Sequence, residues 1–254
     1  MKLLRFFVLF CLTTNLVYAK KIRDTCEEFP PKSVVAILVD VSEPFDAPNR
    51  MSFEKMVDRI LFEIQPETRL DIYKIAGSTS GVSNPDISLC FPYSTSLMQG
   101  DKYWAKKREK EFYGPARNSL TKLGESVTPG QSSPILESIF TMSLKSFVAK
   151  GAANNLPGRV VVISDFMQHS PQLSFYQNIP NYASWRSSVN GRSWVRSFGN
   201  VAIEAVVIPR YGSSSLPRPG RDFFISYFDE NFSDFQKYKK FVWRDLASSV
   251  TPAK

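Results

Sequence analysis

Ser33-Val-Val-Ala-Ile-Leu-Val-Asp40 is the segment of this 254-residue chain that most clearly indicates its fold class. It is a run of mostly β-branched, apolar residues that ends in an acid. A strand that is apolar on both faces is typical of the centre of a parallel sheet covered by helices on each side. Residues 159–165, Arg-Val-Val-Val-Ile-Ser-Asp, repeat this design, and residues 201–208 repeat the apolar run. We therefore expect the strands that end in Asp40 and Asp165 to lie side by side and parallel, which would bring these two acids close together.

Helical patterns separate these runs. Apolar residues recur at helical spacing over 52–64, where Ser52 is a candidate N-cap, and over 133–147, which Ser133-Pro134 opens. A charged helical stretch is expected over 101–125, with a break near Gly114-Pro115. The aromatic tail over 222–246 predicts one or two further amphipathic helices.

Two further segments read as strands. Residues 69–76 alternate, and 87–91 follow after a short turn region, so the two are expected to pair antiparallel. Strand and helix therefore alternate along the chain. This order predicts an α/β fold with a doubly wound, mostly parallel sheet of about six strands, helices on both faces and one short antiparallel edge strand.

The N-terminus has the pattern of a signal peptide. Met1-Lys-Leu-Leu-Arg is followed by an apolar run from Phe6 to Leu12, and Val17-Tyr-Ala19 is suited to cleavage after Ala19. Thr13, Thr14 and Asn15 interrupt the run too early for a spanning helix, although an uncleaved anchor is the alternative. We expect an exported chain, periplasmic or secreted, that has no membrane contact after cleavage.

The expected organisation is one domain with additions. Residues 1–19 are the signal peptide, 20–32 an N-terminal segment, and 33–209 the α/β domain. An aromatic insertion covers 166–200, and a loop with a helical extension covers 210–254.

Composition indicates a folded protein without a nucleic-acid site. Hydrophobic residues make up 43% of the chain, enough for a sizeable core, and the net charge of +8 is mild for this length. The densest basic cluster, Lys106-Lys107-Arg108 with Lys110, alternates with glutamates in a helical stretch, which is typical of a solvated face. Nucleic acid is therefore not expected as a partner.

Cys26 and Cys90 are the only cysteines left after cleavage, since Cys11 lies in the signal peptide. An even pair in an exported chain usually forms a disulfide, so we expect a Cys26–Cys90 bridge. Two separate buried thiols are the alternative.

The strand ends predict the site. Ligands of open parallel sheets bind beyond the carboxyl ends of the strands, where Asp40 and Asp165 stand. Two carboxylates in a poorly hydrated crevice repel unless a cation lies between them or one is protonated. Carboxylates and hydroxyls are hard oxygen ligands, which suit Mg²⁺, Ca²⁺ or Mn²⁺.

Three segments resemble the von Willebrand factor A domain. Asp40-Val-Ser-Glu-Pro44 is similar to the opening Asp-x-Ser-x-Ser of its metal-ion-dependent adhesion site, and Gly130-Gln-Ser-Ser-Pro-Ile135 resembles the Gly-Gly-Thr-Pro-Leu segment with its threonine ligand. Val162-Ile-Ser-Asp165 resembles the strand with its second aspartate. The likeness extends over about 33–209.

The resemblance implies Asp40, Ser42, Ser133 and Asp165 as metal ligands, direct or through water. Pro44 replaces the second serine and has no side-chain oxygen, so a divalent cation is expected to bind weakly or not at all. Glu43 is near enough to substitute for the lost ligand. An empty crevice with both aspartates satisfied by amides and hydroxyls is the alternative.

The aromatic insertion leaves from the same edge as Asp165. It supplies Tyr182, Trp185, Arg186, Arg192 and Trp194, a mixture that anchors protein interfaces. Packing of these rings onto the domain is the alternative, and the sequence favours neither of the two.

These observations favour a binding module over an enzyme. No Gly-rich nucleotide motif is present, and no nucleophile elbow accompanies the single histidine, His169. We expect a protein partner at the strand-end face, and the resemblance implies that a partner carboxylate completes the metal shell. Such exported proteins also resemble accessory proteins of bacterial mobile elements, which serve envelope or conjugation machinery. The alternatives are a metal-dependent hydrolase built on Asp40 and Asp165, and a structural envelope subunit with contacts through the aromatic tail.

Overall fold

A computed structural model describes residues 26, 30–42, 44–75, 77, 81–82, 84–92, 102–126, 132–148, 156–208, 216–232 and 241–245. The expected signal peptide, most of the segment 20–32, and Glu43 lie outside these described residues. So do Gly130 and Gln131 of the second motif. No helix in the described part of the chain is long and apolar enough to cross a bilayer.

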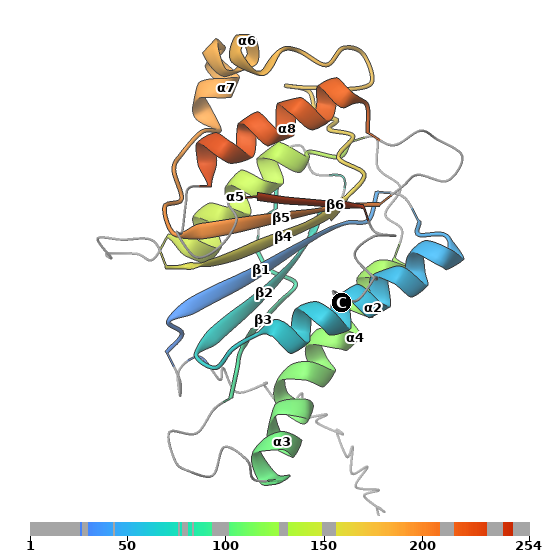
Figure 1. Ribbon diagram of the computed structural model, residues 1–254, viewed down its shortest axis with the longest axis vertical. Helices are drawn as coiled ribbons and strands as arrows, with labels where there is room; N and C mark the ends of the chain where they lie inside the picture. The colour runs from blue at the N-terminus through green and yellow to red at the C-terminus, as the bar shows by residue number, and fades with distance from the viewer. Residues whose placement is uncertain are drawn as a thin grey trace, which may run out of the picture.

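The molecule is built around one mixed sheet (Figure 1). Its strand order is β3-β2-β1-β4-β5-β6. The strands are β1 (Ser33–Asp40), β2 (Thr68–Ile75), β3 (Ile87–Cys90), β4 (Gly158–Ser164), β5 (Val201–Val207) and β6 (Phe241–Asp245). All neighbours are parallel except β2 and β3, which are antiparallel. The predicted α/β class with a mostly parallel sheet and an antiparallel edge strand is confirmed.

Strands β1 and β4 are parallel neighbours, as their matched sequences predicted. Val39 is in register with Ile163, so Asp40 and Ser164 end the two strands side by side. Alternate residues of β1 belong to different hydrophobic clusters: Ala36 and Leu38 to one, Ile37 and Val39 to the other. The strand therefore buries both faces, which is the physical reason that it carries no polar alternation.

Helices pack on these clusters (Figure 1). Helix α2 (Ala47–Glu63) and helix α4 (Gly114–Glu125) join the cluster of Ile37 and Val39. Helix α5 (Ile135–Phe147) and helix α8 (Arg218–Asn231) join the cluster of Ala36 and Leu38.

The start of α2 corrects one prediction. Ser52 is not the N-cap, because the helix begins at Ala47 and the side chain of Asp46 accepts a hydrogen bond from the Asn49 N–H. Pro48 lies in the first turn, where its missing N–H costs nothing. The start was predicted too late because the apolar residues of the helix begin only at Phe53, after its first turn.

The predicted break at Gly114-Pro115 is also wrong in form. Helix α3 (Lys102–Arg108) continues through a π-helical turn (Glu109–Tyr113) into α4. The Gly114 N–H donates to the Glu109 carbonyl, and a Cβ on Gly114 would lie 2.8 Å from that oxygen. The wide turn therefore needs glycine here, and Pro115 lies in the first turn of α4.

The tail differs from its helical prediction in its second half. Helix α8 begins at Arg218, ahead of the expected start at 222, and ends at Asn231. Residues 241–245, which were expected to be helical, form β6 and pair in parallel with β5. A short apolar run does not by itself distinguish a strand from a helix, and the free edge of β5 selected the strand here.

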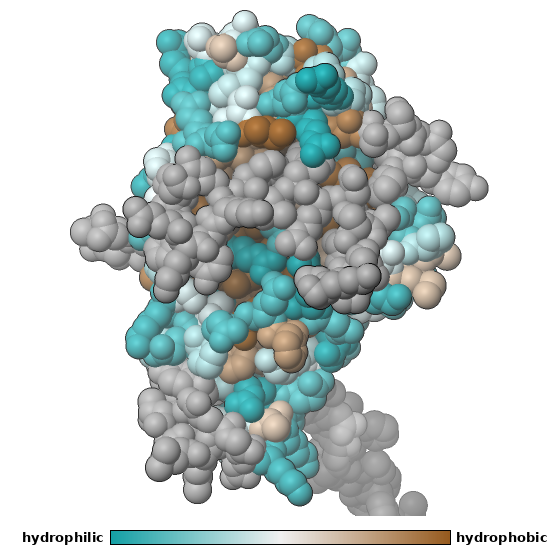
Figure 2. Space-filling model, in the orientation of Figure 1, coloured by the Kyte–Doolittle hydropathy of each residue, from teal (hydrophilic) through white to brown (hydrophobic). Residues whose placement is uncertain are grey.

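The aromatic insertion forms α6 (Tyr182–Ser187) and α7 (Val189–Ser193), which lie beyond α8 in Figure 1. The Trp185 ring lies 5.0 Å from the Phe223 ring and 6.1 Å from the Trp194 ring. On the side of the molecule in Figure 2, hydrophilic residues cover most of the coloured surface and hydrophobic residues occur in small groups. The large hydrophobic side chains that are exposed in the described part are Met51, Phe62, Tyr103, Tyr176 and Val189.

Cys26 and Cys90 form the expected disulfide, with Cα atoms 5.0 Å apart. Cys90 pairs with Arg69 at the end of the antiparallel edge strand. The bridge therefore fastens the segment before β1 to the far edge of the sheet.

Reduction should destabilise the protein substantially. The bridge closes a sequence separation of 64 residues, for which loop-closure entropy gives a stabilisation of about 4 kcal/mol. We expect the Cys26→Ser/Cys90→Ser double variant to lose a free energy of unfolding of this size in urea titrations. Thiol labelling of the denatured, unreduced wild type should find no free thiol, and two labelled thiols would show that the bridge does not form in solution.

Candidate functional site

The site is centred on the carboxylate of Asp40, which is only 5% exposed at the end of β1. Its Oδ2 accepts hydrogen bonds from the hydroxyls of Ser133 at 2.9 Å and Ser164 at 2.8 Å. Its Oδ1 accepts from the backbone N–H of Ser42 at 3.0 Å. A carboxylate has about four acceptor positions, so three donors satisfy most of its capacity and make its burial tolerable.

Ser133 reaches Asp40 because a small backbone ladder holds it in place. Its N–H donates to the His169 carbonyl at 2.8 Å, and the His169 N–H donates to the Ser133 carbonyl at 2.9 Å. Helix α5 begins two residues later, at Ile135. The ladder therefore joins the start of α5 to the loop after β4, and it brings residues 93 positions apart into one hydrogen bond.

The chain turns sharply after β4. Asp165 Oδ1 accepts from the Met167 N–H at 2.8 Å, and Ser164 Oγ accepts from the Phe166 N–H at 2.9 Å. Phe166 itself has a φ of 60°, a left-handed conformation that is costly for a residue with a Cβ. Its fully buried ring lies 5.0 Å from the ring of Phe224 on α8, so packing offsets the backbone strain.

A second buried polar group supports the ladder from inside. Gln168, with no exposed surface, accepts from the Leu136 N–H through Oε1 at 2.9 Å, which caps the first turn of α5. Its Nε2 donates to Glu137 Oε2 at 3.0 Å and contacts Ser170 Oγ at 3.2 Å. These bonds hold the start of α5 against the loop that carries Asp165.

Glu137 is the costly member of this network. Burial raises the pKa of its carboxyl above the usual value, and hydrogen bonds from Ser170 and Gln168 lower it only in part. Among the described residues, neither Glu137 Oε1 nor the buried hydroxyl of Tyr227 on α8 has a hydrogen-bond partner. An unsatisfied carboxylate oxygen in this layer favours the protonated acid.

The imidazole ring of His169 makes its described contacts with Ser174 and Tyr176. Its Nδ1 lies 2.9 Å from Ser174 Oγ, and its ring is edge-on to the Tyr176 ring at 5.3 Å. Of the described hydrogen bonds of this ring, none goes to Asp40 or Asp165. Among the described residues, the link between His169 and the site is its backbone ladder with Ser133.

The structure places the predicted metal ligands at one edge, where Ser42, Ser133 and Asp40 are joined by hydrogen bonds and Asp165 follows Ser164 directly. Glu43 is outside the described residues, and Pro44 is exposed beside it. Sequence reasoning missed Ser164 and Gln168. The signal for Ser164 was a hydroxyl at the last position of an otherwise apolar strand, whereas nothing near Gln168 pointed to the start of α5.

Of the predicted partner-binding side chains, Glu43 lies outside the described residues and Arg192 is exposed, whereas Tyr182, Trp185, Arg186 and Trp194 pack on or bond to the domain. Trp185 is 6% exposed and lies against Phe223, and Trp194 is half-buried beside it. Arg186 Nε donates to Glu230 Oε1 at 2.7 Å, and the Tyr182 hydroxyl donates to Glu230 Oε2. Their role in partner binding stays a prediction.

The oxygen atoms at this edge are of the kind that hard cations prefer. A hydroxyl that gives its proton to Asp40 keeps its oxygen lone pairs, and no described group donates to Ser133 Oγ. The described residues include no group of three or more His, Cys, Asp or Glu side chains that could hold a metal. Hydroxyl and water oxygens would therefore have to supply much of any shell.

Comparison of the sequence with protein-family models and with curated proteins finds no match.

Replacing Glu137 by Gln should stabilise the protein at neutral pH. The pKa of Glu137 is raised in the folded state, so its contribution to stability is full below the unfolded pKa and is lost as pH rises through the folded pKa. The free energy of unfolding of Glu137→Gln should therefore exceed that of the wild type by an amount that grows as pH rises above about 4.5.

Urea titrations at several pH values measure this difference. Glu54→Gln, at an exposed position on α2, is the control and should show no such growth. A Glu137→Gln variant that is less stable than the wild type at pH 8 would show that the buried carboxylate is favoured in its ionised form.

Proposed function

We propose that this chain is an exported protein-binding module that uses the carboxyl-end edge of its sheet and has a weak or lost divalent metal site. We further propose that its fold is a doubly wound sheet of about six strands, with helices on both faces, of the von Willebrand factor A type. The order of the three motif segments supports that assignment, as does the adjacency of β1 and β4. No catalytic role is proposed for the site.

The single observation that carries the proposal is the bonding of Asp40. A buried acid from β1 gathers one hydroxyl from the start of α5 and one from the end of β4. Three segments that are distant in sequence therefore present oxygen atoms at one place on the ligand edge of a parallel sheet. Such an arrangement is suited to holding a cation, or a partner group, without a chemical step.

The same geometry supports weak rather than tight cation binding. Three donors already engage the carboxylate of Asp40, so a cation would have to compete with them or bind through water. Pro44 supplies no oxygen where the resembling motif has a serine. Water can fill the vacant position, but it brings no chelation, so the affinity falls.

The partner that we propose is a protein; where a cation is held at this edge, a carboxylate of the partner would complete its shell, and without a cation the partner binds through other groups. The half-buried His169 pairs with Ser133 through its backbone, and its ring contacts that of Tyr176, which is 53% exposed, so these two residues continue the surface from Ser133.

Tyr182 and Arg186 bond to Glu230 at the end of α8, and the carbonyl of the next residue, Asn231, accepts from the Phe198 N–H just before β5 begins. These two side chains therefore lie toward the amino end of the strands, and a partner that contacts them would use a second surface away from the Asp40 edge. Service in an envelope or conjugation apparatus is the cellular role that we propose.

Mg²⁺ should raise the melting temperature of the wild type only slightly, because a ligand far below saturation stabilises by little more than RT ln(1 + [L]/Kd). Asp40→Ala should abolish the shift. It should also cost about 1–3 kcal/mol for each buried hydroxyl that loses its acceptor. Ser133→Ala keeps both acids and should reduce the shift as well. Scanning calorimetry with and without Mg²⁺ measures each effect.

Ser226→Ala is the matched control, since this exposed hydroxyl on α8 bonds only to a backbone carbonyl of its own helix. Its Mg²⁺ response should equal that of the wild type. Titration calorimetry that found sub-micromolar Mg²⁺ or Ca²⁺ binding would refute the weakened site. A response that survives Asp40→Ala would place the cation elsewhere.

Photo-cross-linking can test the partner edge directly. A photoreactive amino acid at Pro44, which is exposed beside the site, should give a discrete protein adduct in host cells. The same group at Asn200, which is exposed at the opposite edge of the sheet, should not give that adduct. Adducts that are identical from both positions, or a Pro44 adduct that Tyr176→Ala and Ser133→Ala leave unchanged, would contradict binding at this edge.

A further inference from the structure

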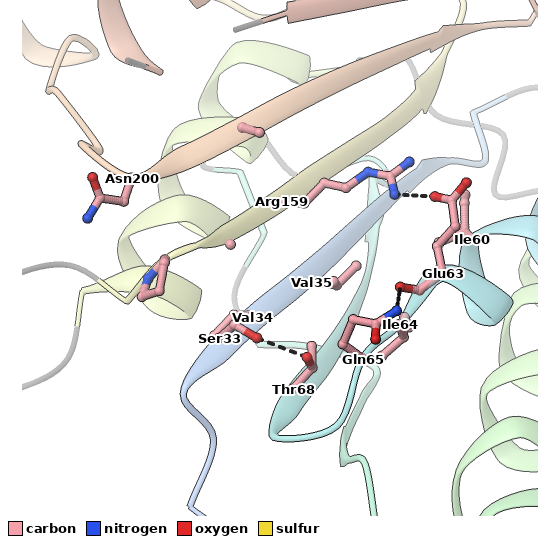
Figure 3. Close-up of a pocket in the computed structure, with 13 residues that line it drawn as sticks. Ser33, Val34, Val35, Ile60, Glu63, Ile64, Gln65, Thr68, Arg159 and Asn200 are labelled. Carbon is pink, nitrogen blue, oxygen red and sulfur yellow. Dashed lines mark hydrogen bonds and ion pairs between the residues drawn. The ribbon is translucent and has the colours of Figure 1, made fainter. Parts of the chain in front are cut away.

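A cavity of about 450 Å³ opens at the other edge of the sheet, where the parallel strands begin. Figure 3 shows it between the last turns of α2 and the first residues of β1, β4 and β5. The volume is within the range of cavities that hold small organic ligands. It lies at the opposite end of the strands from Asp40, so it is separate from the site described above.

Strand register explains the floor of the cavity. Val35 of β1 is in register with Arg159 of β4, and Arg159 with Ala202 of β5. Ala202 is too small to fill the space above it, and the side chain of Arg159 crosses the sheet toward Glu63 on α2 (Figure 3). A hollow is therefore left beside the guanidinium of Arg159, because none of the described residues places a large apolar side chain in the space between the sheet and α2 at this point.

The walls are mainly apolar. Ile60 and Ile64 of α2 form one side, and Pro157 and the backbone of Gly158 form the other. The hydroxyls of Ser33 and Thr68 bond to each other at 2.9 Å, so neither requires a ligand. The amides of Gln65 and Asn200 lie at the exposed rim, where they can donate to or accept from a bound molecule.

The charges at the cavity cancel. Arg159 pairs with Glu63 at 2.5 Å and also with Glu204, while Arg59 pairs with Glu204 at 3.0 Å. Burial by itself would raise the pKa of Glu204, but Arg159 and Arg59 lower it below the usual value, so this carboxylate is ionised at neutral pH. Two cations face two anions, and the cavity offers no net charge to an ionic ligand.

We infer that this cavity is a binding site for a small, uncharged, mostly apolar molecule. Its apolar body lies on Val35 and Ala202 against Ile60 and Ile64, and one hydrogen-bonding group reaches the amides of the rim. The balanced ion pairs favour a neutral compound over its charged analogue, because a charge would be desolvated there without a partner.

Two fluorescent probes with the same aromatic framework test the size and the charge of the ligand. N-phenyl-1-naphthylamine is neutral, and 8-anilinonaphthalene-1-sulfonate carries an added sulfonate. The folded wild type should bind the neutral probe saturably at one site and bind the anionic probe at least about tenfold more weakly. Glu63→Gln removes one anion next to Arg159, so it should raise the affinity for the anionic probe relative to that for the neutral probe.

Ala202→Phe fills the cavity from its floor and should weaken the binding of the neutral probe about tenfold or more. Ala202→Leu is the smaller substitution if the phenylalanine variant melts early by circular dichroism. Phe62→Ser and Ala183→Phe are the controls, since Phe62 is an exposed ring beside the cavity and Ala183 is exposed on α6. Both should leave binding unchanged.

Three results would overturn the inference. They are no saturable binding of the neutral probe, binding that neither Ala202 variant weakens, and wild-type preference for the anionic probe. Loss of binding in Phe62→Ser would show that the probe adheres to the exposed ring instead. None of these results bears on the Asp40 edge, which the Mg²⁺ measurements test separately.

Discussion

The parallel pairing of β1 with β4 organises both the core of the protein and its carboxyl-end edge. Both strands are apolar on both faces, so each needs a helical layer above and below it, and neither can occupy an exposed edge. Their pairing places the two strands with the most apolar side chains at the centre of the sheet. It also brings Asp40 and Ser164 side by side, since the register of Val39 with Ile163 leaves these two residues at the ends of their strands.

The carboxyl-end edge is organised by hydrogen bonds from residues that do not belong to the strands. Asp40 is buried because hydroxyls and an amide reach it, and the Ser133 hydroxyl is available because the ladder with His169 holds the start of α5 nearby. Gln168 stabilises that contact by capping α5 from the loop after β4. Two features of this arrangement are unfavourable. Glu137 keeps one carboxylate oxygen without a hydrogen-bond partner in the described part of the chain, and Phe166 has a left-handed backbone. Strain and unsatisfied polar groups that gather around one edge are what a functional site is expected to show.

The two edges of the sheet differ in physical character. At the carboxyl end, the described side chains of the site are polar, small and mutually bonded. At the amino end, Ala202 and the terminus of α2 leave an apolar hollow, and the charges near it are neutralised by the pairs of Arg159 and Arg59 with Glu63 and Glu204. Trp185 of the aromatic insertion contributes to neither edge. It packs onto Phe223 of α8 and so adds to the helical layer on that face of the sheet.

Features that depend on local pattern could be predicted from the amino-acid sequence. Apolar runs identified β1, β4 and β5, because strands buried on both faces cannot contain alternating polar residues, and the terminal acids marked the ligand edge. The even pair of cysteines predicted the disulfide. Tertiary structure decided the features for which local pattern is ambiguous or silent. Residues 241–245 became a strand because β5 had a free edge for them. Gly114-Pro115 does not end the helix, because the π-helical turn before it places the proline in the first turn of α4. Ser164 and Gln168 joined the site, and a cavity opened above Ala202, because side chains meet according to strand register and helix placement, which no short stretch of sequence encodes.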